Sequence, residues 1–416
     1  MPKFEAWLDT DVVQGEETIF PKVEELVIHE CGSLTALPKA ASVITESSGG
    51  VDTNCRSAFP ALRNMTLEFL NMFDRWDVVE GTLVEGVTFP ELEKLYILSC
   101  ASLATLPKGS LMVKQLFGQA ETVCCRSAFP ALRKLELSGL SALERWGAAE
   151  GTPGEEVTFP LLEGMTIDEC PKLTYLPEAP KLSGLCIKGE GQQISLQAAS
   201  RCIPSLSKLI LVVSPDDTET TLLHVKQKWD HELPLAFMML ARCDLLFSSH
   251  PGALALWTCF ARLVDLTIGG CDALVYWPEN VFQVLVSLRR LWIWSCRKLT
   301  GHTQASDGQS APERGGLLPR LEYLCINGCT SLVEVPNLPA SLKELEIGDC
   351  KYLVEVPNLP ASLKTLCIGR EGEYVMPVGG EGVVQPDTSS LIPGSSGSEA
   401  TASTGHQQPT IAPFHA

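Results

Sequence analysis

The motifs of several enzyme classes are missing from this 416-residue sequence. It has no Gly-Lys pair and so no phosphate loop, no G-x-G-x-x-G after an expected strand, and no G-x-S-x-G nucleophile elbow. His231-Glu232 starts like the zinc motif H-E-x-x-H, but Leu235 stands where the second histidine is needed. No two cysteines have the C-x-x-C spacing of a metal or redox site. We therefore expect no catalysis, no cofactor and no bound metal.

Basic residues and long apolar runs are also scarce. The 32 Lys and Arg residues stand against 50 Asp and Glu, a formal net charge of −18. This balance argues against a surface that binds nucleic acid or an anionic membrane. No apolar run approaches the roughly 18 residues of a membrane-spanning helix, and the opening stretch MPKFEAWLDTDVV holds no apolar core of a secretory signal. These absences predict a cytoplasmic or nuclear protein that binds neither nucleic acid nor membrane.

What the sequence does contain is a repeat, and it is clearest between Leu321 and Gly369. The segment VEVPNLPASLK occurs at 333–343 and again at 354–364. Each copy belongs to the frame L-x-x-L-x-I-x-x-C-x-x-L-x-x-V-P, whose spacing and period are typical of leucine-rich repeats. Because repeats of this kind stack on their neighbours, the pattern predicts a solenoid rather than a closed globular core.

The frame can be followed along most of the chain. Thirteen unevenly spaced frames lie between residues 21 and 375. In the first half, CRSAFPALR occurs at 55–63 and again at 125–133, and VTFP recurs with the same offset at 87–90 and 157–160, which indicates duplication of a two-repeat unit. Residues 1–20 form a lead-in of weak pattern, and the Pro-, Gly-, Ser- and Thr-rich residues 376–416 are predicted to be a disordered tail.

Half of the 16 cysteines share one position of the frame, which indicates a packing role and not a disulfide pattern. A thiol at this position can act as a small, buried, weak donor to the turn backbone after a strand. The cysteines at this position are Cys31, Cys100, Cys170, Cys243, Cys271, Cys296, Cys329 and Cys350.

The stretch L-x-x-L-x-I alternates as a short strand does, with the apolar residues facing one side. Each strand should pair in parallel with the strand of the next repeat. The predicted fold is an α/β-type solenoid dominated by short parallel strands, an irregular leucine-rich-repeat horseshoe with few helices. Because many connections are short and rich in Pro and Gly, coil and 3₁₀ turns are expected on its convex side.

The strand positions between the core residues face outward, on the predicted concave side, where a repeat protein keeps its binding specificity. In most frames they are polar or acidic and predict a solvated face. Two successive frames instead carry Arg289, Arg290, Trp292, Trp294 and Tyr323. Clustered Trp, Tyr and Arg are typical of the residues that dominate protein–protein binding energy. These five residues are the candidate partner-binding site, with packing of the rings on their neighbours or on a flanking domain as the alternative.

The frames between about 20 and 375, with their Phe-Pro lead-ins and Leu-Pro turns, resemble the C-terminal repeat region of plant nucleotide-binding leucine-rich-repeat (NLR) disease-resistance proteins, especially those of cereals. The resemblance is clearest in ALALWTCFARLVDLTIGGCDALVYWPENVFQVLVSLRRLWIWSCRKLTG (253–301) and in LPRLEYLCINGCTSLVEVPNLPASLKEL. It implies a non-catalytic module of innate immunity. Its expected partners are a pathogen effector, a guarded host protein, or the nucleotide-binding switch domain of an NLR receptor.

Two other classes of protein compete with this interpretation. A leucine-rich-repeat substrate-recognition or scaffold protein unrelated to immunity, such as a ubiquitin-ligase adaptor, is the alternative. An extracellular receptor ectodomain would carry several glycosylation sequons, whereas this sequence has one, Asn64-Met65-Thr66. Since the sequence has no phosphate loop, no nucleotide-binding residue is carried over from the NLR family.

Overall fold

The structure is a computed structural model. It describes residues 20–37, 41–47, 50–56, 59–74, 76, 89–106, 111–116, 119–125, 129–146, 159–189, 191–194, 196–212, 233–247, 251–301, 317–335, 338–356 and 359–369. The chain divides into two units, residues 1–373 and 374–416, and every described residue lies in the first. The predicted tail and nearly all of the predicted lead-in therefore lie outside the described residues.

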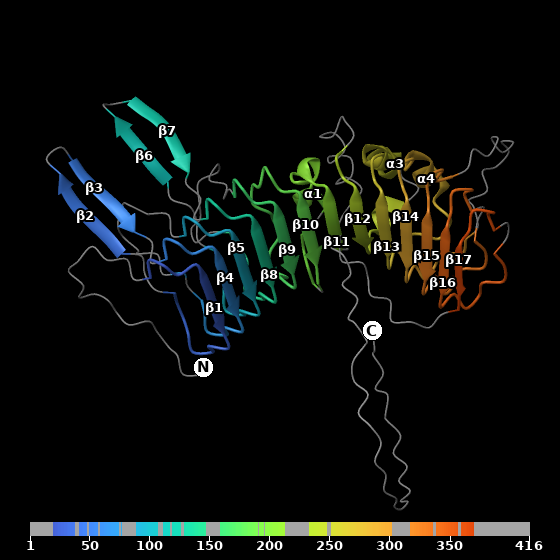
Figure 1. The fold of residues 1–416 in the computed structure, drawn as a ribbon, viewed down its shortest axis with the longest axis horizontal. Coiled ribbons are helices and arrows are strands. Elements are labelled where there is room, and N and C mark those ends of the chain that lie inside the picture. Colours follow the sequence, from blue (N-terminus) through green and yellow to red (C-terminus); the bar gives the residue numbers. More distant parts are fainter. Residues whose placement is uncertain are drawn as a thin grey trace, which may run out of the picture. The chain divides into compact units, whose positions relative to one another are not determined.

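One open sheet of thirteen parallel strands organises the described part of the chain (Figure 1). Neighbours in the sheet follow one another in sequence, apart from two hairpins that do not join it. Each strand coincides with one predicted frame, which confirms the predicted solenoid of short parallel strands. The strands are β1 (Glu25–His29), β4 (Asn64–Glu68), β5 (Lys94–Leu98), β8 (Lys134–Ser138), β9 (Gly164–Asp168), β10 (Gly184–Lys188), β11 (Lys208–Val212), β12 (Phe237–Ala241), β13 (Asp265–Gly269), β14 (Arg290–Trp294), β15 (Tyr323–Asn327), β16 (Glu344–Gly348) and β17 (Thr365–Ile368).

The helices of the described residues are few and short, as predicted. They lie in the connections of the second half of the sheet: α1 (Leu196–Ala199), α3 (Pro251–Trp257) and α4 (Glu279–Val284), with 3₁₀ turns η1 (Ile203–Ser205), η2 (Asp244–Phe247) and η3 (Thr258–Phe260). Two antiparallel hairpins were not predicted: β2 (Ala41–Ser47) with β3 (Gly50–Arg56), and β6 (Leu111–Leu116) with β7 (Gln119–Cys125). The starts of β2 and β6 have the same offset as the two copies of CRSAFPALR, so the hairpins occupy equivalent places in the duplicated unit.

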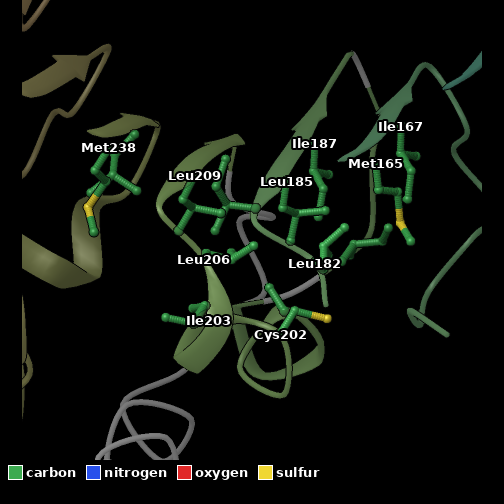
Figure 2. Close-up of a cluster of buried hydrophobic side chains, with 14 of the residues drawn as sticks. Met165, Ile167, Leu182, Leu185, Ile187, Cys202, Ile203, Leu206, Leu209 and Met238 are labelled. Carbon is green, nitrogen blue, oxygen red and sulfur yellow. The ribbon is translucent and has the colours of Figure 1, made fainter. Parts of the chain in front are cut away.

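The core is built by the register between neighbouring strands. Leu324 of β15 lies beside Leu345 of β16, and Ile326 lies beside Ile347, and the same pairing of apolar residues recurs along the sheet. Because side chains alternate across a strand, these residues all face one side, and they are buried there except on the end strands β1 and β17. Figure 2 shows the row continuing from Met165 and Ile167 of β9 through the next strands, including Leu209 of β11 and Met238 of β12.

In eight of the thirteen repeats, a cysteine closes the turn after the strand by donating to the carbonyl oxygen two residues before it. The Cys170 thiol donates to the carbonyl oxygen of Asp168 at 3.4 Å, and the Cys271 thiol donates to that of Gly269 at 3.3 Å. The Cys271 sulfur also accepts from the Cys243 N–H of the preceding repeat at 3.3 Å. These bonds confirm the predicted role of the thiol as a buried donor to the turn. Burial raises the pKa of Cys170 from the ordinary 9.0 to about 11, so this side chain stays a neutral thiol at neutral pH.

The tandem copies provide a matched test of this packing. Leu345 is fully buried, whereas Leu366, its equivalent in the next repeat on the end strand β17, is 43% exposed. Leu345→Ala should lower the free energy of unfolding by about 2–5 kcal/mol, because it removes buried methyl groups and leaves a cavity. Leu366→Ala should cost less than about 1 kcal/mol. Urea unfolding measures both, and equal losses would contradict the end-strand position of β17.

Candidate protein-interaction surface

The outward face of the sheet changes character from β11 to β15. In the first half of the sheet this face carries mostly charged and polar side chains, such as Lys134 and Asp168, with Val27, Tyr96 and Leu98 as apolar or aromatic exceptions. Between β11 and β15 the same positions hold more large apolar and aromatic residues, together with Arg290, and most of these side chains are partly buried. We call this group the outward patch and define it as Ile210, Phe237, Met239, Arg290, Trp292, Trp294 and Tyr323.

Strand β13 forms the floor of the outward patch. All five of its residues are buried, whereas β14 beside it shows the usual alternation of buried and accessible positions. The register sets Met239, Thr267 and Trp292 in one row across β12, β13 and β14, and Ala241, Gly269 and Trp294 in another. Thr267 therefore lies between two larger side chains, whereas Gly269 lies between Ala241 and the much larger Trp294.

Trp294 is packed onto this floor. A Cβ atom added to Gly269 would collide with Cε2 of the indole, so the ring occupies the space that a side chain would fill there. The position is outward, as predicted, and the ring is partly buried against its neighbour. The sequence left two roles open for this ring, partner binding and packing on its neighbours. The contact with β13 is packing of the second kind.

Trp292 and Tyr323 form an aromatic pair at the accessible part of the outward patch. Their ring centroids are 5.0 Å apart with the planes tilted by 43°, and the Arg290 guanidinium lies 5.9 Å from the Trp292 ring centre. Burial raises the pKa of the Tyr323 hydroxyl above its ordinary value, helped by the charges of Cys325 and Glu346 and by a hydrogen bond to Glu346, while a hydrogen bond from Trp292 opposes the shift. Tyr323 is therefore a neutral phenol at any physiological pH.

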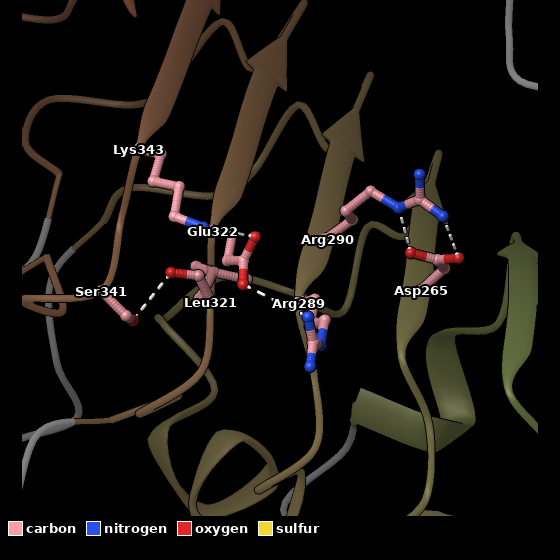
Figure 3. A network of polar contacts seen from close by, with 7 residues as sticks. All are labelled: Asp265, Arg289, Arg290, Leu321, Glu322, Ser341 and Lys343. Atoms are coloured by element: carbon pink, nitrogen blue, oxygen red, sulfur yellow. Dashed lines mark hydrogen bonds and ion pairs between the residues drawn. The ribbon is translucent and has the colours of Figure 1, made fainter. Parts of the chain in front are cut away.

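Arg290 is fixed by a two-pronged ion pair with Asp265 of β13 (Figure 3). Its Nη2 lies 2.7 Å from Asp265 Oδ2, and its Nε donates to Oδ1. The hydrogen bonds to Asp265 raise the pKa of Arg290, against a smaller opposing effect of burial. The pair thus holds the guanidinium beside Trp292 in one orientation.

Arg289 lies elsewhere, in a row of residues just before the strands. Its Nη1 is 3.4 Å from Glu322 Oε1, and Lys343 Nζ is 2.9 Å from Glu322 Oε2 (Figure 3). The hydrogen bond from Lys343 is the main cause that lowers the pKa of Glu322. Of the five predicted site residues, the structure brings Arg290, Trp292, Trp294 and Tyr323 together on the outward face. It places Arg289 in the row of residues just before the strands.

We call the row of residues that directly precede the strands the entry row. It is charged at both ends of the sheet and uncharged in the middle. Successive members are joined by backbone hydrogen bonds: Glu24, Arg63, Glu93, Arg133, Glu163, Ser183, Ser207, Ala236, Val264, Arg289, Glu322, Lys343 and Lys364. In the first part of the row, ion pairs join successive members, such as Arg133 and Glu163. The four uncharged members precede β10 to β13, so the row is neutral beside the start of the outward patch. A partner that covers this part of the row desolvates no ion pair there.

Sequence reasoning missed the first half of the outward patch. Ile210, Phe237 and Met239 occupy outward positions of the frames that begin at Leu206 and Leu235. The signal was present, because the same parity that selects Trp292 also selects these residues.

Among the described residues, no group of three or more His, Cys, Asp or Glu side chains is arranged to hold a metal ion. In the same described part, no helix is long and apolar enough to cross a membrane.

The contact of Trp294 with Gly269 predicts a sharp cost for one added methyl group. Gly269→Ala should lower the free energy of unfolding by about 1–3 kcal/mol and move the tryptophan emission to longer wavelength, because the indole is pushed toward water. Gly164→Ala is the matched control on the outward face of β9, since nothing lies within 4 Å of its added Cβ. The same urea midpoint and the same emission for both variants would refute the packing of Trp294 on β13.

Comparison with known proteins points to one group of relatives. No known family profile matches the chain. The probable disease resistance protein RF9 of Arabidopsis thaliana is 29% identical over 195 residues, which cover 39% of this chain and 17% of that protein. Disease resistance protein RPP8 of the same plant is 36% identical over 98 residues, or 24% of this chain and 9% of that protein. Probable disease resistance protein RF45 is 28% identical over 166 residues, 32% of this chain and 15% of that protein.

Each match spans less than a fifth of the relative's length. The similarity therefore concerns a part of these proteins and supports a relationship to plant disease resistance proteins.

Proposed function

We propose that the chain is a non-catalytic protein-interaction module of plant immunity. In this proposal it corresponds to the C-terminal repeat region of an NLR receptor, acts in the cytoplasm or nucleus, and recognises a pathogen effector or a guarded host protein. A nucleotide-binding switch domain is a further partner that it would restrain. The observation that carries the proposal is the outward patch, which gathers aromatic and apolar side chains with Arg290 on the outward face of β11, β12, β14 and β15.

The outward patch has the physical properties of a binding surface. Trp292 and Tyr323 are already held against each other, and Arg290 is held by Asp265. Ordering these side chains before a partner arrives reduces the entropy that binding would otherwise cost. All of them stand on strands, so their positions are fixed by the backbone ladder and not by a loop. Aromatic and arginine side chains of this kind concentrate binding energy in few residues.

The similarity to disease resistance proteins favours immunity over the alternative role in ubiquitin ligation. The relatives are named for disease resistance, and the matches to them reach 36% identity. The names of these relatives indicate the process in which this chain would act. The outward patch supplies the surface with which it would act.

The proposal makes a testable prediction about Trp292. In affinity capture from infected and healthy plant tissue, followed by titration of the captured protein, Trp292→Ala and Trp294→Ala should each weaken binding at least tenfold, because each removes a buried anchor at the interface (about 1.4 kcal/mol per factor of ten). Tyr276→Ala is the matched control, an aromatic that is 47% exposed outside the outward patch. Urea unfolding of each variant excludes loss of fold.

Binding that is unchanged in both tryptophan variants would disprove the proposed site. Binding that is lost equally in Tyr276→Ala would show that the captured protein recognises another surface.

A further inference from the structure

The outward patch and its floor contain two buried polar atoms that have no hydrogen-bond partner. Among the described residues, three buried side-chain nitrogen or oxygen atoms lack a partner: Nε1 of Trp76, Oγ1 of Thr267 and Nε1 of Trp294. Two of the three lie on the same face of the neighbouring strands β13 and β14. Thr267 is 1% exposed, so bulk water does not reach its hydroxyl. This concentration in one place calls for a physical explanation.

Several donors of the same kind on other described repeats are satisfied. The indole N–H of Trp146 donates to the Tyr175 carbonyl at 2.8 Å, and that of Trp257 donates to the Leu246 carbonyl at 2.9 Å. Thr300, near the end of the repeat that follows β13, donates from its hydroxyl to the Val275 carbonyl at 3.0 Å. A buried polar group left without a partner destabilises the fold, because its lost hydrogen bonds to water are not replaced. The outward patch therefore carries a local cost that these other sites avoid.

The two unpaired atoms belong to side chains on the same face of adjacent strands, in neighbouring outward rows of β13 and β14. The indole of Trp294 fills the side-chain space of Gly269, and its Nε1 is among the three atoms that an added Cβ there would meet first. Thr267 and Gly269 lie on one face of the strand, alternate positions separated by about 7 Å. An indole N–H can only donate, and a threonine hydroxyl can donate as well as accept. The complementary group is therefore an acceptor that takes both hydrogens.

We infer that the partner of the outward patch inserts a side-chain carbonyl or carboxylate oxygen between Trp294 and Thr267. The inserted group is the side chain of an Asn, Gln, Asp or Glu in the partner. The half-buried indole shifts off Gly269, and the oxygen accepts from Trp294 Nε1 and from the Thr267 hydroxyl. A partner without such an acceptor leaves both donors unpaired and is rejected, so the two residues set specificity. The inference rests on the proposed function, since it describes the partner of the same surface.

The first test uses the free protein. Thr267→Val keeps the shape of the side chain and removes the unpaired hydroxyl, so it should raise the urea midpoint of the full chain. Thr300→Val is the matched control and should lower the midpoint, because it removes a hydroxyl that is bonded to Val275. A midpoint that falls in both variants would show that the Thr267 hydroxyl has a partner in the folded chain, and the inference would be overturned.

The second test looks for the acceptor directly. Acetamide and acetate serve as probes, titrated in parallel into the ¹⁵N-labelled full chain, and the Trp294 indole N–H signal is identified by its loss in Trp294→Phe. We expect a downfield shift of this signal with at least one probe and a shift at least threefold smaller in Thr267→Val. The probe that acts distinguishes an amide from a carboxylate side chain.

No shift with either probe, or an equal shift in Thr267→Val, would overturn the inference. Neither test needs the natural partner. Their failure would therefore leave the binding experiment on Trp292 standing, and the two outcomes can be told apart.

Discussion

The parallel register that sets leucine beside leucine is the constraint on which the rest of the structure depends. Leu324 beside Leu345 and Ile326 beside Ile347 are one instance of a pairing that runs through the thirteen strands. Because side chains alternate, burying these rows on one face leaves the intervening residues on the other. A slip by one residue would exchange the two faces. The core therefore fixes which side chains a partner can meet.

The same register turns distant residues into neighbours. Phe237, Asp265, Arg290 and Tyr323 come from four different repeats, yet they lie in one row across four strands. In this row Arg290 bonds to Asp265, and in the next outward row Trp292 lies beside Thr267. Where a small residue stands beside a large one, as Gly269 does beside Trp294, the large side chain folds over it. The outward patch is a product of this lateral matching of sizes and charges.

The sequence predicted the strands, the buried residues and the open parallel sheet, because each depends on spacing within one frame. It also placed Trp292, Trp294 and Tyr323 on the outward face by parity. It did not predict the burial of Cys325, an outward residue that is 4% exposed because Tyr323, Trp292 and Glu346 surround it. The contact of Trp294 with Gly269 and the place of Arg289 on the entry row were missed for a related reason. They depend on which side chains meet across strands, and a frame read alone does not contain that information.

Hydroxyl-radical footprinting of the full chain, with and without a captured partner, tests the central claim most directly, since it reports the accessibility of individual side chains. In the free chain, Trp292 and Tyr276 should be oxidised, and the buried Met238 should be protected while Met239, next to it on the opposite face of β12, reacts. The partner should then protect Trp292, Trp294 and Met239 and leave Tyr276 unchanged. Equal reactivity of Met238 and Met239 in the free chain, or protection by the partner confined to the first half of the sheet, would contradict the account.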